Sequence, residues 1–383
     1  MFSQRTNWSL TENALTKGIR KFKESHREVI DLTISNPTQC GFCYPRNILS
    51  ALSNSQNLIY EPSPRGLLEV RATICDYYRE EGFTLSPEQI FLTSSTSEAY
   101  SYLFRLLTNA GDKFLFPKPS YPLFSFLGDL NDVEFNFYPL VYEQEWRIDL
   151  EKIKGMIDKK TKGLVLVNPN NPTGSFVQES ERISLNKICG RDMSIISDEV
   201  FWDFAWNNKI PRVSLVNNHD VLTFILGGLS KTLALPQMKL SWIIINGPKD
   251  LVKEASGRLE VIADTYLSVN TPAQQALKTW MPMRRDIQGQ IKKRLQENMS
   301  CLERNGCRVL NTQGGWYAIL ELPSSKNEEE WLLEFLNKDR VLVHPGYFFD
   351  FENEPCVILS LLPPCSVFEE GLKRIVKRIH LLR

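Results

Sequence analysis

The sequence lacks any excess of charge, because its 45 lysines and arginines equal its 45 aspartates and glutamates. No run of five or six like charges occurs, which excludes a basic nucleic-acid footprint and a charged disordered tail. No window stays apolar over the about 18 residues that a membrane span needs, and the N-terminal stretch has no signal-peptide core. No repeat or low-complexity tract is visible. These absences predict a cytoplasmic globular protein whose partners are small molecules or other protein surfaces.

Histidine is also scarce, with four in 383 residues, and the eight cysteines form no dense framework. Widely spaced cysteines are typical of reduced intracellular thiols and not of a disulfide scaffold. Cys40 and Cys43 form one C-x-x-C pair, which is open to a redox role or to half of a zinc site. Because no second Cys or His pair at ligand spacing accompanies it, we favour incidental loop cysteines and predict no metal.

Between about residues 47 and 280, short apolar runs such as KGLVLVNP and MSIISDEV alternate with segments of helical period such as SEAYSYLFRLL. Strands separated by helices predict an α/β fold with a mostly parallel sheet sandwiched by helices. Near residue 285 the pattern changes to charged helices and a few short strands. We therefore predict a large domain over 47–284 and a smaller α+β domain that combines 1–46 with 285–383.

Polar residues follow several of the predicted strands. Hydroxyl side chains fill residues 93–97, Asn171 lies in the turn-rich NPNNPTG, and Asp198 directly follows an apolar run. In open α/β sheets, ligands bind beyond the carboxyl ends of the strands, and hydroxyls at a helix N-terminus suit an anion. Taken singly, each feature is as consistent with a helix cap, a loop or a salt-bridge partner. Lys231 and Lys239 stand out more, because their flanking residues are almost wholly apolar, small or hydroxylic.

In combination and in order, the motifs resemble the class I and II aminotransferases among the fold-type-I pyridoxal phosphate enzymes. The resemblance covers nearly the whole chain. It rests on DLTISNP, YEPSPRGLLEVR, LTSSTSEAY, PSYP, NPNNPTG, SDEVF, SKTLALPQMKLSW, GGWYAIL and HPGYFF. It implies a large domain that binds pyridoxal 5'-phosphate (PLP), together with the smaller domain.

The resemblance gives Lys231 the central role, as the residue that forms the internal aldimine with the cofactor aldehyde and later acts as a base. Asp198 would face the pyridine nitrogen and keep it protonated, so that the ring withdraws electrons from the substrate Cα. Asn171 would donate to the ring hydroxyl oxygen, and Tyr121 would stack on the ring face. The residues implied in phosphate binding are Ser95, Thr96, Ser230 and Lys239.

Several of these positions depart from the family pattern. Lys239 replaces an arginine, so the phosphate anchor keeps its charge and loses the bidentate geometry. Ser95 stands where glycine is frequent and Gly228 where serine is frequent, which leaves the set of hydroxyl contacts open. Phe201 replaces a tyrosine that bonds to the ring oxygen, which predicts a raised pKa of the internal aldimine. Tyr60 matches a residue that reaches the neighbouring subunit's cofactor, which implies a homodimer with shared active sites.

The largest departure concerns the substrate carboxylate. Family members that act on α-amino acids usually bind this group through the arginine of a V-R-L-S stretch. This chain has Ile358 at that position, and no arginine lies between Arg340 and Arg374. Either another cation binds the carboxylate or the substrate lacks one. We predict Arg65, in an apparent one-residue insertion, as the replacement, against the alternative of a surface arginine over the dimer seam.

The same resemblance lines the substrate pocket with the N-terminal segment that contains Ile34, Ser35 and Asn36. Trp316 and Tyr317 are either pocket wall or core, and we favour core because large rings are usually buried. Arg71 is expected to brace its helix or to face outward.

The implied activity is a ping-pong transfer of an amino group between an amino acid, or an amine, and a 2-oxo acid. The orientation of the breaking bond against the ring selects this reaction over others, and carboxylate binding sets that orientation. A PLP-dependent lyase or decarboxylase is therefore the alternative on this fold. A sensor without catalysis is disfavoured, because Lys231, Asp198 and Asn171 are all present.

Overall fold

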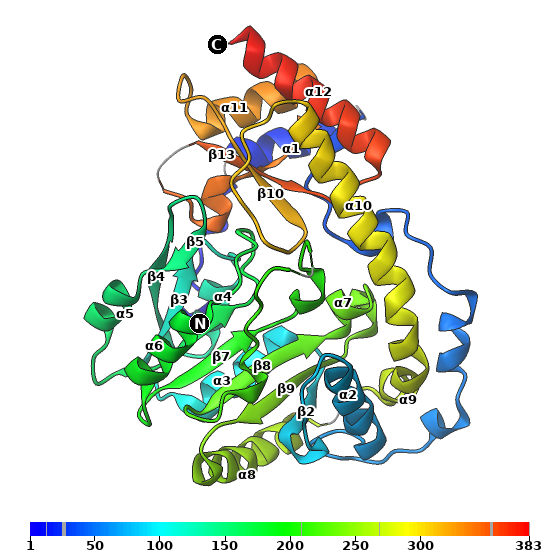
Figure 1. Ribbon diagram of the computed structural model, residues 1–383, viewed down its shortest axis with the longest axis vertical. Coiled ribbons are helices and arrows are strands. Elements are labelled where there is room, and N and C mark those ends of the chain that lie inside the picture. The colour runs from blue at the N-terminus through cyan, green and yellow to red at the C-terminus, as the bar shows by residue number, and fades with distance from the viewer. Residues whose placement is uncertain (13, 25–27, 208, 268, 353–354, 383) are drawn as a thin grey trace.

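A computed structural model describes residues 1–12, 14–24, 28–207, 209–267, 269–352 and 355–382 of the chain. Figure 1 shows a broad sheet with flanking helices in the lower part and a smaller group of short strands and helices above it. No described helix is both long and apolar enough to cross a membrane. We call the lower part the large unit and the upper part the small unit.

The large unit is built on an eight-stranded sheet with the strand order β2-β9-β8-β7-β6-β3-β4-β5. Its strands are β2 (Ile90–Thr93), β3 (Lys113–Lys118), β4 (Glu134–Tyr142), β5 (Trp146–Ile148), β6 (Thr161–Val167), β7 (Ser194–Asp198), β8 (Thr223–Gly228) and β9 (Ser241–Asn246). Strands β4, β3, β6, β7 and β8 pair in parallel, whereas β5 and β9 run antiparallel to their neighbours. Because β2 is antiparallel to β9, β2 points the same way as β8. The predicted, mostly parallel α/β sheet is confirmed.

Helices cover both faces of this sheet, because its central strands are apolar on both sides. One face packs on α2 (Leu68–Glu80), α5 (Leu150–Met156), α6 (Glu179–Cys189) and α9 (Thr271–Trp280), and the other on α3 (Thr96–Leu107), α4 (Phe124–Leu130) and α8 (Lys249–Tyr266). Within β6, Leu164 and Leu166 join the first core while Val165 and Val167 join the second, as the two-residue period of a strand requires.

The small unit contains a three-stranded antiparallel sheet, β10-β13-β12, and a short parallel pair, β1-β11. Its strands are β1 (Ile30–Asp31), β10 (Tyr317–Glu321), β11 (Val341–Leu342), β12 (His344–Pro345) and β13 (Cys356–Ser360). Its helices are α1 (Ala14–Glu24), α10 (Arg284–Arg304), α11 (Glu328–Glu334) and α12 (Cys365–Leu381). The pairing of β1 with β11 joins the N-terminal segment to the C-terminal part of the chain.

The first residues of the chain depart from the predicted domain division. The Arg5 guanidinium pairs with Asp132, and the Trp8 indole donates to Asp129 at 2.6 Å, so this stretch lies against the large unit. The structure therefore attaches part of segment 1–46 to each unit, and the placement of the boundaries at 47 and 284 stays a prediction.

A backbone contact fixes one hairpin of the small unit, residues 309–320, against the large unit; the two arms of this hairpin pair at Val309 and Leu320. Gly314 pairs with Ala205, and the Gly315 N–H donates to the Phe204 carbonyl at 3.0 Å. Gly174, at the end of the NPNNPTG motif, lies so close that a Cβ there would sit 2.2 Å from the Gly314 carbonyl oxygen, and its φ is +68°. Only glycine combines this left-handed backbone with so close an approach. The contact sets the position of the segment that leads into β10.

We expect Gly174→Ala to destabilise the protein by about 2 to 5 kcal/mol, from the left-handed backbone and the forced displacement of the hairpin. Gly155→Ala is the matched control, because a Cβ there meets no atom within 4 Å and the residue lies in α5. The free energy of unfolding in urea measures both. Equal free energies of unfolding for the two variants would contradict the requirement for glycine at residue 174.

Candidate active site

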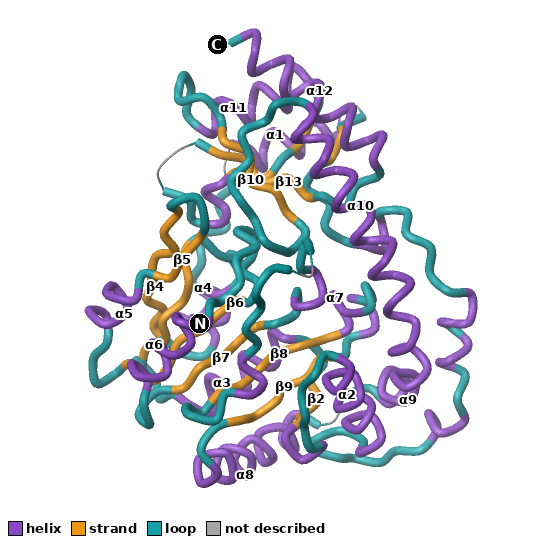
Figure 2. The backbone as a smooth tube through the Cα atoms, in the orientation of Figure 1, coloured by secondary structure: helices purple, strands orange, loops and turns teal. Residues whose placement is uncertain are grey.

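The carboxyl ends of β2, β6, β7 and β8 lie along one edge of the large sheet, and β9 begins at the same edge. Residues far apart in sequence therefore gather there: the serines that follow β2, the NPNNPTG loop that follows β6, Asp198 at the end of β7 and the lysine that follows β8. Figure 2 shows these loops collected between the large sheet and strands β10 and β13. This edge is where ligands bind in open α/β sheets.

Asp198 is a buried carboxylate held by two donors. The Tyr100 hydroxyl donates to its Oδ2 at 3.1 Å and the Val200 N–H to its Oδ1 at 3.2 Å. Burial nevertheless raises the pKa of Asp198 to about 6. Tyr100 was missed by sequence reasoning, although it lies one helical turn beyond the hydroxyl residues that begin α3. Glu199 is a separate case, since it accepts from Ser214 Oγ at 2.6 Å and holds a neighbouring loop.

Lys231 follows β8 on the single-turn helix α7 (Leu229–Thr232). Its Nζ lies 4.7 Å from the centroid of the Trp316 ring and 5.1 Å from that of Phe201, and the two rings meet edge to face. Burial lowers the pKa of Lys231 to about 8, and the negative charge of Asp198 opposes the shift. Burial therefore accounts for the lowered pKa. The neutral amine is therefore accessible near neutral pH.

Asn171 brings a buried amide to the same edge. Its side chain is 9% exposed, and its Oδ1 has no hydrogen-bond partner among the described residues. The preceding Asn170 differs, since its Nδ2 donates to Thr173 Oγ1 and to the Pro119 carbonyl. A buried polar atom without a partner is costly, so the site fits a ligand that carries a polar group at this point.

The residues predicted to bind phosphate lie on several different loops. Ser95 Oγ caps α3 by accepting from the Glu98 N–H at 3.1 Å, so the helix-cap alternative holds for this residue, while its hydroxyl hydrogen can still donate to an anion. Thr96 and Ser230 are partly exposed. Lys239 is exposed and has the left-handed backbone conformation, with φ +51°. The Glu98 carboxylate borders this group, where it accepts from the Ser94 N–H at 2.6 Å.

Trp316 and Tyr317 are buried, as predicted for core residues, and they also border the site. The Trp316 ring faces Lys231, and its Nε1 has no hydrogen-bond partner among the described residues. The Tyr317 hydroxyl is hydrogen-bonded to Ser35. The two roles coexist because these residues lie where the small unit's hairpin meets the large unit.

The N-terminal segment is held against β13. The Ser360 hydroxyl donates to the Ile34 carbonyl at 2.7 Å, and the Asn36 side chain accepts from the Thr38 N–H at 3.1 Å. Ile358, on β13, is fully buried between Ile319 of β10 and His344 of β12. This position therefore supplies only apolar surface.

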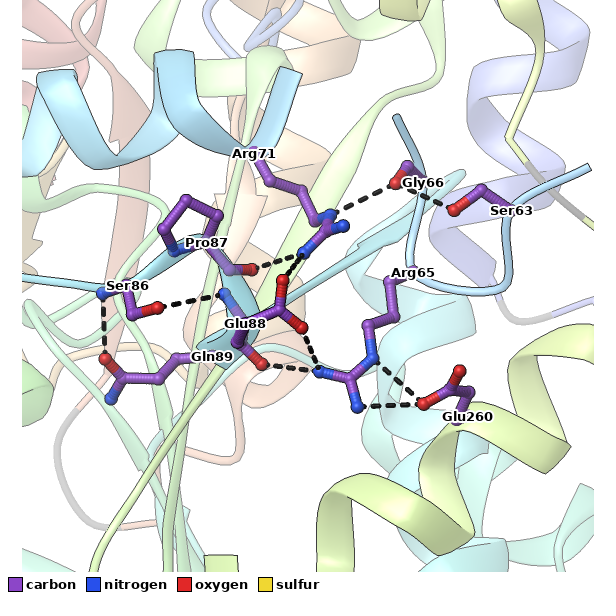
Figure 3. A network of polar contacts seen from close by, with 9 residues as sticks. All are labelled: Ser63, Arg65, Gly66, Arg71, Ser86, Pro87, Glu88, Gln89 and Glu260. Carbon is purple, nitrogen blue, oxygen red and sulfur yellow. Dashed lines mark hydrogen bonds and ion pairs between the residues drawn. The ribbon is translucent and has the colours of Figure 1, made fainter. Parts of the chain in front are cut away.

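Arg65 is already engaged by two acidic residues (Figure 3). Its Nε and Nη2 donate to Glu260 at 3.0 and 2.8 Å, and its Nη1 donates to the Glu88 carbonyl at 2.7 Å. Arg71 lies beside it and donates to the Gly66 carbonyl at 3.1 Å and to Glu88. It is buried, so it does not face outward, and it braces the loop that carries Arg65. No contact among the described residues joins Arg65 to Lys231. Its predicted role as a carboxylate anchor stays a prediction and requires some of these bonds to break.

Two predicted residues extend from the surface. Tyr121 is 42% exposed and Tyr60 is 72% exposed, so a large part of each side chain is left open by the described chain. Of the cysteine pair, Cys43 is exposed, whereas Cys40 is buried and its thiol lies 3.2 Å from the Asn36 carbonyl. Burial raises the pKa of Cys40 to about 11, which does not favour the thiolate that redox chemistry needs.

A model of the family Aminotransferase class I and II matches residues 16–379. The chain belongs to this family. It is an enzyme that transfers amino groups, and the resemblance read from its motifs is confirmed. The glutamate-pyruvate aminotransferase AlaA of Escherichia coli strain K12 is 27% identical over 379 residues, which cover 94% of this chain and 93% of that protein.

Further comparisons agree with this assignment. The tyrosine aminotransferase of Mus musculus is 26% identical over 388 residues, which cover 93% of this aminotransferase and 84% of the mouse protein. Among solved structures, the alanine aminotransferase of Pyrococcus furiosus gives a TM-score of 0.87 at 24% identity and covers 100% of both chains. At that identity the match establishes the shared fold.

We predict that the Lys231 amine reacts with an amine-specific label with a midpoint near pH 8, since the ammonium form predominates below its pKa and the nucleophilic neutral amine above it. Asp198→Asn should lower this midpoint, because it removes the negative charge that stabilises the Lys231 ammonium and so lowers the pKa of the lysine. Site-resolved mass spectrometry after hydroxylamine dialysis, which strips any bound aldehyde, measures the labelling. Lys113 is the internal control, because its contact with Asp158 raises its pKa. Identical midpoints for the two lysines would contradict the prediction.

Proposed function

We propose that this enzyme is a PLP-dependent aminotransferase that moves an amino group from an amino acid or amine to a 2-oxo acid in a ping-pong cycle. The observation that carries the proposal is the Lys231 amine, whose pKa is lowered to about 8 and which lies against Phe201 and Trp316 at the carboxyl edge of the sheet. A neutral lysine amine is the group that condenses with aldehydes.

The surrounding residues fit the parts of PLP. Asp198 supplies a buried carboxylate for the pyridine nitrogen, and Asn171 supplies an amide whose unpartnered Oδ1 can accept from the ring hydroxyl. Tyr121 offers a partly exposed ring for stacking. The hydroxyls and the ammonium for the phosphate come from Ser95, Thr96, Ser230 and Lys239. When bound, PLP supplies an aldehyde for the amino group and a ring that accepts electrons from the substrate Cα.

In this proposal Lys231 also moves a proton. A pKa of about 8 leaves a fraction of the side chain neutral at pH 7, so it can take a proton from the substrate Cα and return it elsewhere. The Asp198 carboxylate, with a pKa of about 6, stays mostly ionised at the same pH. Trp316 and Phe201 lie against the amine and limit the directions from which it can approach a substrate.

A homodimer is proposed from the exposed apolar surface near Tyr60. Apolar side chains that are more than half exposed gather in two stretches of sequence that meet at the Arg65–Glu260 contact. They are Leu58, Ile59, Tyr60, Leu68, Val261 and Leu267. Exposed apolar groups of this size are typical of a subunit interface. We also place the enzyme in the cytoplasm, because all eight cysteines are free thiols.

We expect the purified enzyme to show a visible absorption band that a suitable amino donor removes and a 2-oxo acid restores. The panel begins with glutamate, alanine and tyrosine, paired with pyruvate, because similar proteins carry those substrates in their names, and it includes simple amines because Ile358 offers no cation. Lys231→Ala is the control and should lack the band. Loss of the band with release of ammonia or carbon dioxide would identify a lyase or decarboxylase instead, and a band that no donor changes would identify a sensor.

The two roles open to Arg65 make different predictions for Arg65→Ala. A bracing role through Glu260 and Glu88 predicts a lower melting temperature with an apparent KM within about threefold of wild type, which would rule out Arg65 as the carboxylate anchor. Glu260→Gln is the matched variant, since it weakens the same contact from the other side. A large rise in KM with an unchanged melting temperature would show that Arg65 binds the substrate carboxylate.

A further inference from the structure

Ser241 occupies a central place at the functional edge of the sheet. It is the first residue of β9, and it pairs directly with Thr93, the last residue of β2, and with Gly228, the last residue of β8. The chain continues from Thr93 into Ser95 and Thr96, and from Gly228 into Ser230 and Lys231. One residue thus lies between the two loops that carry most of the proposed phosphate-binding hydroxyls.

Gly228 leaves room for the Ser241 side chain. A Cβ added at Gly228 would lie 2.4 Å from Ser241 Oγ and 3.0 Å from its Cβ, so positions 228 and 241 compete for one space. Directly opposed residues of antiparallel strands point to the same face of the sheet, which explains the competition. A hydroxyl at this point can come from either strand, and in this chain it comes from β9.

The Ser241 hydroxyl has no hydrogen-bond partner within the described part of the chain. The residue is 3% exposed, yet its Oγ is not among the fully buried side-chain atoms that lack a partner, so the hydroxyl keeps a small opening to solvent. Ser194 is a useful contrast: it is equally buried, begins β7 at the opposite edge, and donates to the Lys162 carbonyl. Hydroxyls of residues this deeply buried normally have a partner, so the Ser241 hydroxyl is free to donate to a ligand that brings an acceptor to this opening.

The surroundings favour an anionic acceptor. Lys239, two residues before Ser241, carries the positive charge and itself has the left-handed backbone conformation from which the chain enters β9. The hydroxyls of Ser95, Thr96 and Ser230 lie on the two loops that follow the strands on either side of Ser241. A cation together with several hydroxyl donors suits the oxygens of a phosphate monoester.

We infer that the Ser241 hydroxyl donates a hydrogen bond to the phosphate group of the cofactor, in the space that a side chain at residue 228 would otherwise fill. This inference rests on the proposed PLP function. It assigns Ser241 as a cofactor-binding residue that reaches the phosphate from β9, and it accounts for glycine at 228.

The test compares Ser241→Ala with its matched control Ser194→Ala. Dissociation constants are measured by fluorescence titration of cofactor-stripped protein with PLP and, separately, with pyridoxal, which lacks the phosphate. A lost hydrogen bond to a charged group predicts roughly ten- to hundredfold weaker PLP binding by Ser241→Ala. Pyridoxal binding should stay within about twofold of wild type, and Ser194→Ala should bind both ligands as wild type does.

A second test moves the hydroxyl from residue 241 to residue 228, to check that the two positions share one space. The double variant Gly228→Ser/Ser241→Gly moves the hydroxyl from β9 to β8 and should recover most of the PLP affinity that Ser241→Gly loses. Melting temperatures establish that each variant is folded, and if the exchange does not fold, the Ser241→Ala comparison decides.

The outcomes separate this inference from the proposed function. If wild-type protein binds PLP and Ser241→Ala binds it equally well, the inference is wrong and the proposed function stands. Equal weakening for PLP and pyridoxal, or a folded exchange variant without recovery, also overturns it. Wild-type protein that binds neither ligand would contradict the proposed function itself.

Discussion

The common direction of the central strands is the constraint on which the site depends. Parallel strands bring every carboxyl end to one edge, and the two reversals at β9 and β5 leave this arrangement intact. Apolar packing on both faces fixes the register of these strands, since a slip by one residue would exchange the two cores. Asp198 and Lys231 gain their positions from that register and not from any direct bond between them.

Burial sets the chemistry of this edge. It disfavours charge on both groups, so it raises the pKa of Asp198 to about 6 and lowers that of Lys231 to about 8. The two shifts move the pKa values toward each other, and near pH 7 both groups remain mostly charged, with a reactive minority of neutral lysine. Tyr100 supports the carboxylate through a hydrogen bond, whereas the aromatic rings beside Lys231 offer no acceptor.

Sequence reasoning captured the features that depend on local pattern. The apolar runs predicted the sheet, and the motif order predicted the family to which the chain belongs. It missed what depends on register and tertiary contact. Tyr100 reads as an ordinary helix residue until β7 is placed beside α3, and Arg65 reads as free until the acids of two other segments enclose it. Trp316 is both core and site wall, a combination that burial preference alone does not reveal.

The relation between Gly228 and Ser241 explains why comparing motifs one position at a time misleads. Residue 228 is glycine where serine is frequent in the family, so a comparison of this position alone suggests that a hydroxyl has been lost. Ser241, which pairs with Gly228 across the two strands, fills the same space, so the hydroxyl comes from β9 instead of β8. Ile358 poses the same question for the substrate. Since β13 buries it between two neighbouring strands, a replacement cation must come from a different element, and the place to seek it is the space around Lys231.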